Sequence, residues 1–310
     1  MIHTVRLPSV VLSSAALGLA LLPAAASAEG GGATSPTAGG GATYAQPTRD
    51  RPVRSHRRRR GPLLTEFQLR RPRLFLYGRP ARVTFTIKSR YRSVRVRLRL
   101  LRPGGRQAVS TISLGQRPTR VRQSFLLTGR ENGILPQGRY QLRIGALDRR
   151  GRHLRRLATV SRSAELSFLH HRFPLVGPYS FGGPGARFGA PRSGHTHQGQ
   201  DVSAAQGTPI VAPHGGTVTT VQYQAAGAGY YVVLHGQGER YDYVFMHLSA
   251  GSTRVRQGQH VRTGQRIGDV GATGDAQGPH LHFELWLGPW FGGGHPIDPL
   301  PFLQRWASWS

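Results

Sequence analysis

Two histidines near the carboxyl end of the sequence have the spacing of metal ligands. His280 and His282 are two residues apart, and the run 281–287 reads as a strand. Because alternate side chains of a strand share one face of the sheet, both imidazoles project from the same face. Zinc in a hydrolase takes three protein ligands, usually histidine and carboxylate, and keeps one position for water. The pair therefore predicts metal ligands or proton-transfer groups.

Two further elements carry the same kind of side chain. His197 and Asp201 belong to an H-x-G-x-D motif in which Gly199 permits a close backbone approach, and His247 ends the apolar run 243–248. Together these groups exceed what one zinc requires, so at least one histidine is left for proton transfer. Each motif alone would match by chance, but their combination indicates a metal-dependent hydrolase. The remaining histidines, His171 and His214 among them, are interpreted as surface or packing residues.

The elements that position these side chains are expected to be strands. No segment after residue 62 sustains a 3.6-residue apolar period for long, although 301–306 fits one helical turn. From 173 onward, glycines recur at short intervals between apolar runs. The prediction is an all-β chain whose last domain, 172–310, carries the chemistry.

Residues 63–171 read as a separate β domain. The run 94–100 alternates strictly between apolar residues and arginine, and 81–87 and 139–144 repeat the pattern. Turn signals rich in Gly, Pro, Asn and Asp separate these runs. Short strands at such spacing predict an antiparallel, immunoglobulin-like β-sandwich. It contains no catalytic constellation, so a binding or spacing role is expected.

The net charge differs strongly between the two predicted domains. The 310 residues include 42 Lys+Arg, 13 Asp+Glu and no Cys, for a formal net charge of +29. Residues 63–171 carry +21 of this and 172–310 only +2. The absence of Cys excludes disulfides, thiolate metal sites and a cysteine nucleophile. The asymmetry predicts that the basic domain contacts an anionic polymer or surface.

The amino-terminal residues predict export. Residues 1–28 combine Arg6, an apolar run and a small-residue cleavage site, which is typical of a signal peptide. Residues 29–62 form a Gly/Pro/Arg-rich segment that predicts a flexible linker. The apolar run is too short for a membrane anchor, so we expect a secreted, extracytoplasmic protein without a transmembrane segment in its mature form.

From about 177 to 303 the sequence resembles the lysostaphin-type (LytM-like) zinc endopeptidases of peptidoglycan. The resemblance rests on the H-x-G-x-D motif, the segments 207–212, 216–218 and 246–248, the Gly-Gln repeats, the H-x-H-F-E motif at 280–284 and Asp298-Pro299. It implies the antiparallel sheet of that fold (a duplicated hybrid motif), with peptidoglycan as the substrate and a wall-associated location. The anionic partner of the basic domain would then be a wall polymer or the envelope surface.

The resemblance also implies roles for individual residues. His197, Asp201 and His282 would hold zinc, and His247 and His280 would flank the attacking water and the scissile carbonyl. His280 is the first choice for the general base because it shares a sheet face with His282. His247 would stabilise the oxyanion or pass a proton to the leaving amine, and the sequence does not fix which of the two histidines takes which role.

Several other classes are weighed against this reading. The H-E-x-x-H motif of zincins and the G-x-S-x-G motif of serine hydrolases are absent, and a biotinyl carrier would need a lysine that 172–310 lacks. The main alternative is a non-enzymatic wall-binding or amidase-activating regulator of the same fold, which would be expected to lack ligands. Nucleic-acid binding by the arginine-rich half is a third class, and predicted export argues against it.

Overall fold

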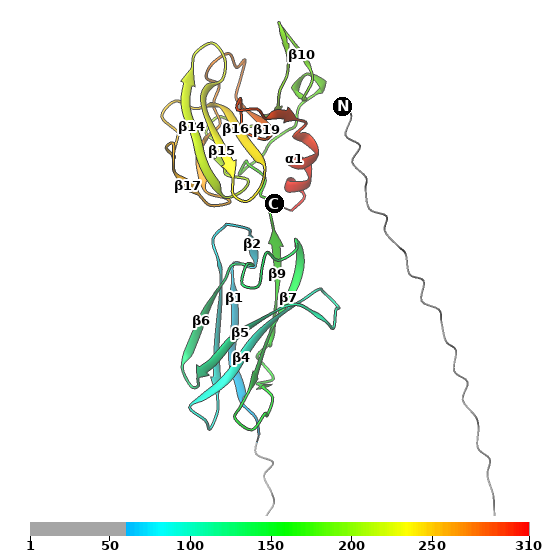
Figure 1. The fold of residues 1–310 in the computed structure, drawn as a ribbon, viewed down its shortest axis with the longest axis vertical. Coiled ribbons are helices and arrows are strands. Elements are labelled where there is room, and N and C mark those ends of the chain that lie inside the picture. Colours follow the sequence, from blue (N-terminus) through cyan, green and yellow to red (C-terminus); the bar gives the residue numbers. More distant parts are fainter. Residues whose placement is uncertain (1–59, 310) are drawn as a thin grey trace, which may run out of the picture. The chain divides into compact units, whose positions relative to one another are not determined.

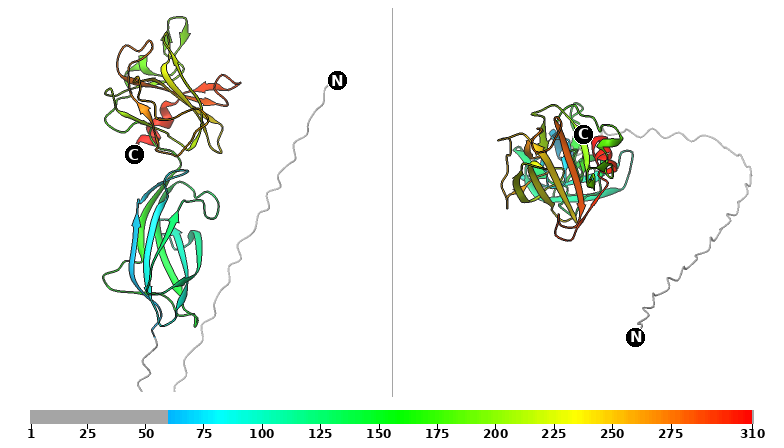
Figure 2. Two further views of the ribbon diagram at one scale, coloured as in Figure 1. Left: turned by 90° about the vertical axis from the view of Figure 1, so that its left-hand side faces the viewer. Right: turned by 90° about the horizontal axis from the view of Figure 1, so that it is seen from above.

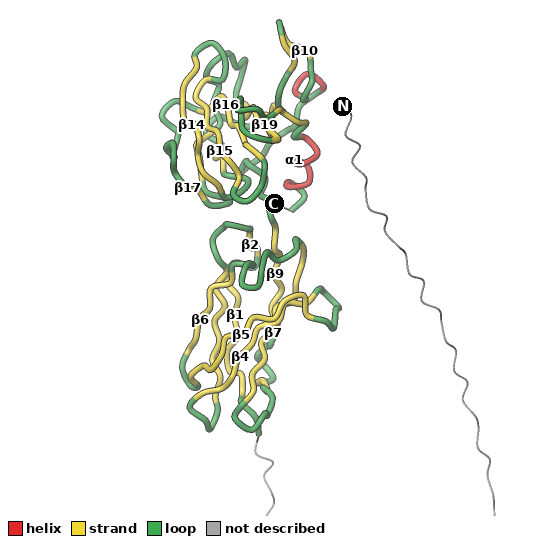
Figure 3. Tube along the Cα trace, in the orientation of Figure 1, coloured by secondary structure: helices red, strands yellow, loops and turns green. Residues whose placement is uncertain are grey.

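Strands dominate the molecule. The computed structural model describes residues 60–309, so the predicted signal peptide and residues 29–59 of the predicted linker lie outside the described residues. Within this range the helical elements are a 3₁₀ turn, η1 (Pro184–Ala186), and one α-helix, α1 (Leu300–Ala307) (Figure 3). The all-β expectation is confirmed in this coarse form.

The chain between residues 63 and 169 forms two β-sheets. Their strand orders are β6-β3-β1-β8 and β2-β9-β7-β4-β5 (Figure 1). Side chains of both sheets, such as Phe85 and Leu142, belong to one buried core cluster. The immunoglobulin-like character of this sandwich stays a prediction. Its strands are β1 (Leu63–Arg70), β2 (Arg73–Phe75), β3 (Ala81–Lys88), β4 (Ser93–Leu101), β5 (Ala108–Pro118), β6 (Arg122–Leu127), β7 (Gly138–Leu147), β8 (Arg155–Arg156) and β9 (Ser163–Leu169).

Strand β4 shows why these residues form a sheet with two different faces. Val96 and Leu98 are fully buried, whereas Arg95 and Arg97 between them are exposed. The period of two puts the apolar side chains into the core and leaves the guanidinium groups in solvent. The predicted alternation is therefore found in the structure.

The chain after residue 190 contributes a seven-stranded sheet and two two-stranded sheets. The large sheet has the order β12-β19-β16-β15-β14-β17, with β20 paired to β19, and the small sheets are β10-β11 and β13-β18 (Figure 1). Figure 2 shows the same ribbon in two further views. The strands are β10 (Pro191–Arg192), β11 (His195–Thr196), β12 (Gln200–Ser203), β13 (Pro209–Val211), β14 (Gly216–Gln224), β15 (Gly229–Gly236), β16 (Tyr241–Leu248), β17 (His260–Val261), β18 (Arg266–Asp269), β19 (His280–Leu287) and β20 (His295–Ile297).

Helix α1 is longer than the single turn that the sequence suggests. Leu300, Leu303 and Trp306 recur every three residues and are buried on one helical side. Leu303 and Trp306 join the core cluster of the large sheet, and this burial extends the helix. Within residues 60–309 no helix has the length and apolar character needed to cross a bilayer.

Candidate metal centre

Strand pairing brings the predicted metal ligands together. β12 runs antiparallel to β19 and places Asp201 opposite His282. β16 flanks β19 on its other side and ends at His247 and Leu248. His197 precedes β12 by three positions, so one sheet edge collects groups that are up to 85 residues apart in sequence.

The three side chains meet at their heteroatoms. His197 Nε2 lies 3.0 Å from Asp201 Oδ1 and 2.9 Å from His282 Nδ1. His282 Nδ1 lies 2.9 Å from the same Asp201 oxygen. Gly199 makes this approach possible, because a Cβ there would lie 2.8 Å from His282 Nε2 and 2.5 Å from the Phe283 carbonyl oxygen. The close backbone approach expected at Gly199 is what the structure shows.

The hydrogen bonds at the outer nitrogens of His197 and His282 determine whether their inner nitrogens, which face each other, carry a proton or a lone pair. His197 Nδ1 donates to the Arg187 carbonyl oxygen at 2.7 Å, and His282 Nε2 donates to Glu284 Oε1 at 3.1 Å. In its neutral form each ring therefore presents a lone pair at its inner nitrogen. Two lone pairs and a carboxylate oxygen converge within about 3 Å, an arrangement that needs a cation or a shared proton at its centre. These residues fit a zinc ion.

The electrostatics of the centre favour positive charge. Burial alone would lower the pKa of His282, but its hydrogen bonds to Asp201 and Glu284 raise it to about 9. Burial would raise the pKa of Asp201, yet the bonds from His197 and His282 hold it well below its usual range. A carboxylate thus stays ionised beside the His282 imidazole, which attracts a proton, or a metal in its place.

Two supporting residues were not singled out from the sequence. Arg192, on β10, donates to Asp201 Oδ2 at 2.9 Å and leaves Oδ1 to face the two imidazoles. Buried Glu284, quoted in the H-x-H-F-E motif but given no role there, orients His282. Glu284 Oε2 accepts the indole N–H groups of Trp286 at 2.7 Å and Trp290 at 3.3 Å. Arg192 lies nine residues before Asp201, but no motif in the sequence marks their contact, whereas the spacing of 282 and 284 on one strand face could have revealed Glu284.

His247 and His280 lie beside the three ligands without joining them. Their ring centroids are 4.8 Å apart, and His280 Nε2 is 3.6 Å from Asp201 Oδ1. His247 Nδ1 donates to the Thr273 carbonyl oxygen at 2.8 Å, and His280 Nδ1 donates to that of Gly278 at 2.8 Å. Both rings therefore keep Nε2 available for proton transfer.

A β-bulge at the end of β16 sets the direction of the His247 side chain. The register between β15 and β16 shifts near the end of β16, and His247 has a φ of +64°, in the left-handed region that non-glycine residues rarely adopt. Burial lowers the pKa of His247 to about 4, so its ring is neutral near pH 7. A buried, neutral imidazole in a sparsely populated backbone conformation is typical of a functional site.

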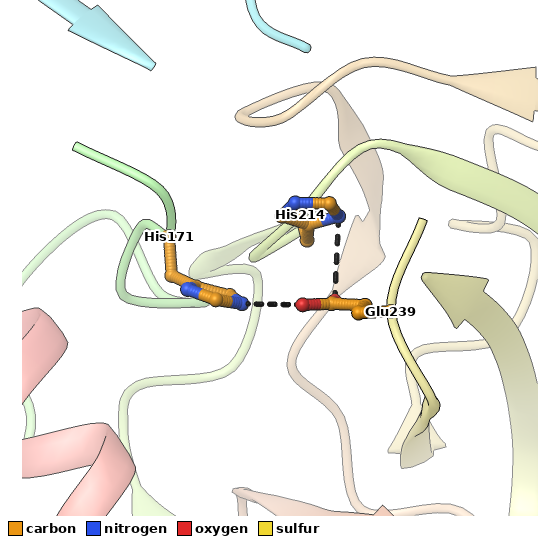
Figure 4. Close-up of side chains that lie close together, drawn as sticks. All are labelled: His171, His214 and Glu239. Carbon is orange, nitrogen blue, oxygen red and sulfur yellow. Dashed lines mark hydrogen bonds and ion pairs between the residues drawn. The ribbon is translucent and has the colours of Figure 1, made fainter. Parts of the chain in front are cut away.

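A second histidine–carboxylate group lies elsewhere in the structure and is built differently. His171 Nε2 lies 3.0 Å from Glu239 Oε2, and His214 Nδ1 lies 3.3 Å from Glu239 Oε1 (Figure 4). Tyr243 also donates its hydroxyl to Glu239, and His214 Nδ1 is 2.8 Å from the Gly215 carbonyl oxygen. Each facing nitrogen can carry a proton here, so hydrogen bonds account for the group without a cation. His171 and His214 are packing residues, as expected, but as members of a polar network.

Comparison with known proteins adds an independent finding. Residues 195–299 match the model of "Peptidase family M23". The chain is 47% identical over 104 residues to an uncharacterized metalloprotease of Haemophilus influenzae, covering 34% of this chain and 20% of that protein. It is 39% identical over 89 residues to the peptidoglycan DD-endopeptidase ShyA of Vibrio cholerae, covering 29% of this chain and 20% of ShyA. The matched segment thus spans about a fifth of these relatives.

A solved structure is also similar. The catalytic domain of the antimicrobial peptidase lysostaphin from Staphylococcus simulans matches with 29% identity and a TM-score of 0.36, covering 41% of this chain and 92% of that domain. All five predicted site residues, 197, 201, 247, 280 and 282, fall inside the segment that the family model matches. The part of the chain that carries the candidate metal centre is thus matched by peptidase family M23.

Proposed function

We propose that this chain is a secreted zinc endopeptidase that hydrolyses peptide bonds in the stem or cross-bridge peptides of peptidoglycan. The observation that carries the proposal is the convergence of two imidazole lone pairs and Asp201 Oδ1 within 3.0 Å of one another. The match to a peptidase family and the name of the relative ShyA support the reaction class and the substrate.

His197, Asp201 and His282 would hold the metal. A zinc ion bound there would lower the pKa of a coordinated water and polarise the scissile carbonyl. Arg192 would keep the second oxygen of Asp201 engaged, and Glu284 would keep the His282 ring in the tautomer that presents Nδ1.

His247 and His280 would move the protons. Neutral His247 offers an Nε2 lone pair near pH 7, which suits a proton acceptor at least as well as the oxyanion role suggested by the sequence. His280 likewise donates its Nδ1–H to a backbone carbonyl, that of Gly278, so either ring can offer Nε2 as the proton acceptor. Whichever ring takes the proton of the attacking water becomes an imidazolium that can donate to the leaving amine.

The regulator alternative makes a different prediction about the same residues. A non-enzymatic protein of this fold has no need for three converging ligands and two flanking imidazoles, and all five are present here. The mature chain, 29–310, should release peptides from purified peptidoglycan, as identified by mass spectrometry, and a chelator should abolish the release. Metal-loaded protein that releases no peptide, while Asp201→Ala binds walls equally well, would favour the regulator.

A further inference from the structure

One face of the β2-β9-β7-β4-β5 sheet carries an excess of arginine. Arg95, Arg97 and Arg99 project from β4, and the residues between them are buried. Neighbouring β7 adds Arg139 and Arg143 to the same face, since Tyr140 and Leu142 point into the core. We call Arg95, Arg97, Arg99, Arg139 and Arg143 the arginine face.

The register concentrates this charge. Arg99 lies directly opposite Arg143, and Arg97 lies opposite Gly145. Like charges that face each other across two strands destabilise a sheet. On the other flank of β4, the three arginines 95, 97 and 99 face Gln116, Ser113 and Thr111 of β5, which are exposed and uncharged. The fold therefore retains a repulsive arrangement that a single carboxylate on either neighbouring strand would relieve.

The acidic residues of 63–171 are mostly engaged elsewhere. Glu66 pairs with Arg122 at 2.8 Å, Asp148 pairs with Arg152 at 2.8 Å, and Glu131 accepts the backbone N–H groups of its own loop. Glu165, opposite Gln141 on β9, is the carboxylate left beside the arginine face. Among the described residues, none makes a hydrogen bond or ion pair with the guanidinium groups of Arg95, Arg97 or Arg99 that the structure records.

We propose that the arginine face binds a linear phosphodiester polymer of the cell wall. Alternate residues along β4 are about 6.6 Å apart, so the three guanidinium groups form a row suited to successive phosphates on an extended chain. Guanidinium groups bind phosphate oxygens in a bidentate way, and the hydroxyls of Ser113 and Thr111 add hydrogen-bond partners beside the row. A membrane surface fits less well, because the alternation buries the apolar side chains of β4 and leaves only polar ones to meet a bilayer.

The test uses the full mature chain, 29–310, in co-sedimentation with walls that carry poly(glycerol phosphate). One set of walls is intact, and the other has had its phosphodiesters removed with cold hydrofluoric acid. We expect binding to intact walls to be about tenfold tighter or more, and to weaken steeply as salt increases. Equal binding to both walls, binding that ignores salt, or equally tight binding to anionic lipid vesicles would overturn the proposal.

Two variants with the same change in net charge distinguish binding by the arginine face from a general effect of positive charge. R95Q/R97Q/R99Q should weaken binding by about tenfold and reduce the magnitude of the logarithmic salt slope by about 2. R70Q/R82Q/K88Q removes the same charge from exposed positions of β1 and β3 in the other sheet, and it should retain binding within about twofold. Equal losses in the two variants would contradict the proposal.

Both variants are checked by thermal unfolding and by cleavage of a short soluble peptide. Peptide cleavage should match that of the wild type in both variants, and neither should melt at a lower temperature, since the positions are exposed or, at Arg99, half-buried, and loss of the Arg99 charge removes its repulsion from Arg143. The binding assay does not require peptidase activity, so it can fail or succeed independently of the proposed function.

Discussion

The decisive contact at the scale of single residues is the 2.9 Å separation of His197 Nε2 and His282 Nδ1. Two imidazole nitrogens approach so closely only when a proton or a cation lies between them. The outer hydrogen bonds to the Arg187 carbonyl and to Glu284 commit the other nitrogen of each ring. The groups that bond to the outer nitrogens therefore favour a cation at this position, as do the three ligands themselves.

The first prediction concerns metal content. Asp201→Ala and His282→Ala should each remove most of the bound zinc, because two remaining ligands hold zinc poorly. His260→Ala is the control, since His260 contacts Thr217 on β14 and lies outside the centre. Metal content by inductively coupled plasma mass spectrometry should fall from about one zinc per chain to near zero in the first two variants only. Wild-type protein that remains active after exhaustive removal of metal would refute the assignment.

The second prediction separates proton transfer from metal binding. His247→Ala and His280→Ala should keep their zinc and lose turnover by about 10²–10⁴, the usual cost of losing acid–base assistance. Peptide release and metal content are measured on the same preparations. If His280→Ala loses zinc as completely as His282→Ala, the roles of these two histidines are reversed.

At the scale of elements, the network of His171, His214 and Glu239 joins three connections of the chain. His171 follows β9, His214 lies between β13 and β14, and Glu239 lies in the turn between β15 and β16. Burial lowers the pKa of His214. Burial opposes ionisation of Glu239, but hydrogen bonding and charge from the histidines lower its pKa overall. The folded chain thus keeps His214 neutral and Glu239 charged.

The third prediction is the pH dependence that follows. Below about pH 6.5 His214 binds a proton in the unfolded chain, whereas in the folded chain its lowered pKa keeps it neutral. The unfolded chain then binds more protons, so the free energy of unfolding falls as pH decreases. Protonation of Glu239 adds to the loss only below its ordinary pKa of about 4.5. His214→Asn keeps a donor for Gly215 and Glu239 but cannot titrate. Its melting temperature should fall less than that of the wild type between pH 7 and pH 5, and an identical fall would contradict the argument.

Sequence patterns anticipated some elements well and others poorly. A period of two predicted the buried and exposed faces of β4, because alternation is a local property of the strand. The five candidate site residues are named from the sequence, and the structure places them close together, while their roles stay predictions. Arg192 and the network around Glu239 were not. No motif marks the contact of Arg192 with Asp201 nine residues later, and the network joins segments that are far apart in the sequence. Local periodicity reports the face that a side chain occupies but not its partner across the sheet.

At the scale of the whole molecule, charge and chemistry occupy different parts of the chain. Residues 63–171 carry +21, whereas 172–310, which hold the candidate metal centre, carry +2. Peptide hydrolysis has no need of such a charge, and a codon preference for arginine would have affected both parts alike. The asymmetry is accounted for if one part retains the protein at an anionic wall and the other cuts.

The fourth prediction tests this division of labour. Raising the salt concentration from about 50 to 300 mM should slow the digestion of intact walls far more than the cleavage of a short soluble peptide. R95Q/R97Q/R99Q should digest walls slowly at low salt and show little further change. A wild type whose two activities decline in parallel with salt would show that the basic part does not contribute to wall digestion.

The two indole groups on Glu284 have a consequence for optical spectroscopy. The protein has four tryptophans, and Trp286 and Trp290 share a carboxylate that is also bonded to a candidate metal ligand. When a metal replaces the proton on His282, the field at Glu284, and with it at both indoles, must change. Intrinsic fluorescence should therefore follow metal loading in real time without any added dye. Glu284→Gln would reduce the change in fluorescence on metal binding. The emission of Trp286 and Trp290 would thus report how much of the metal site is filled.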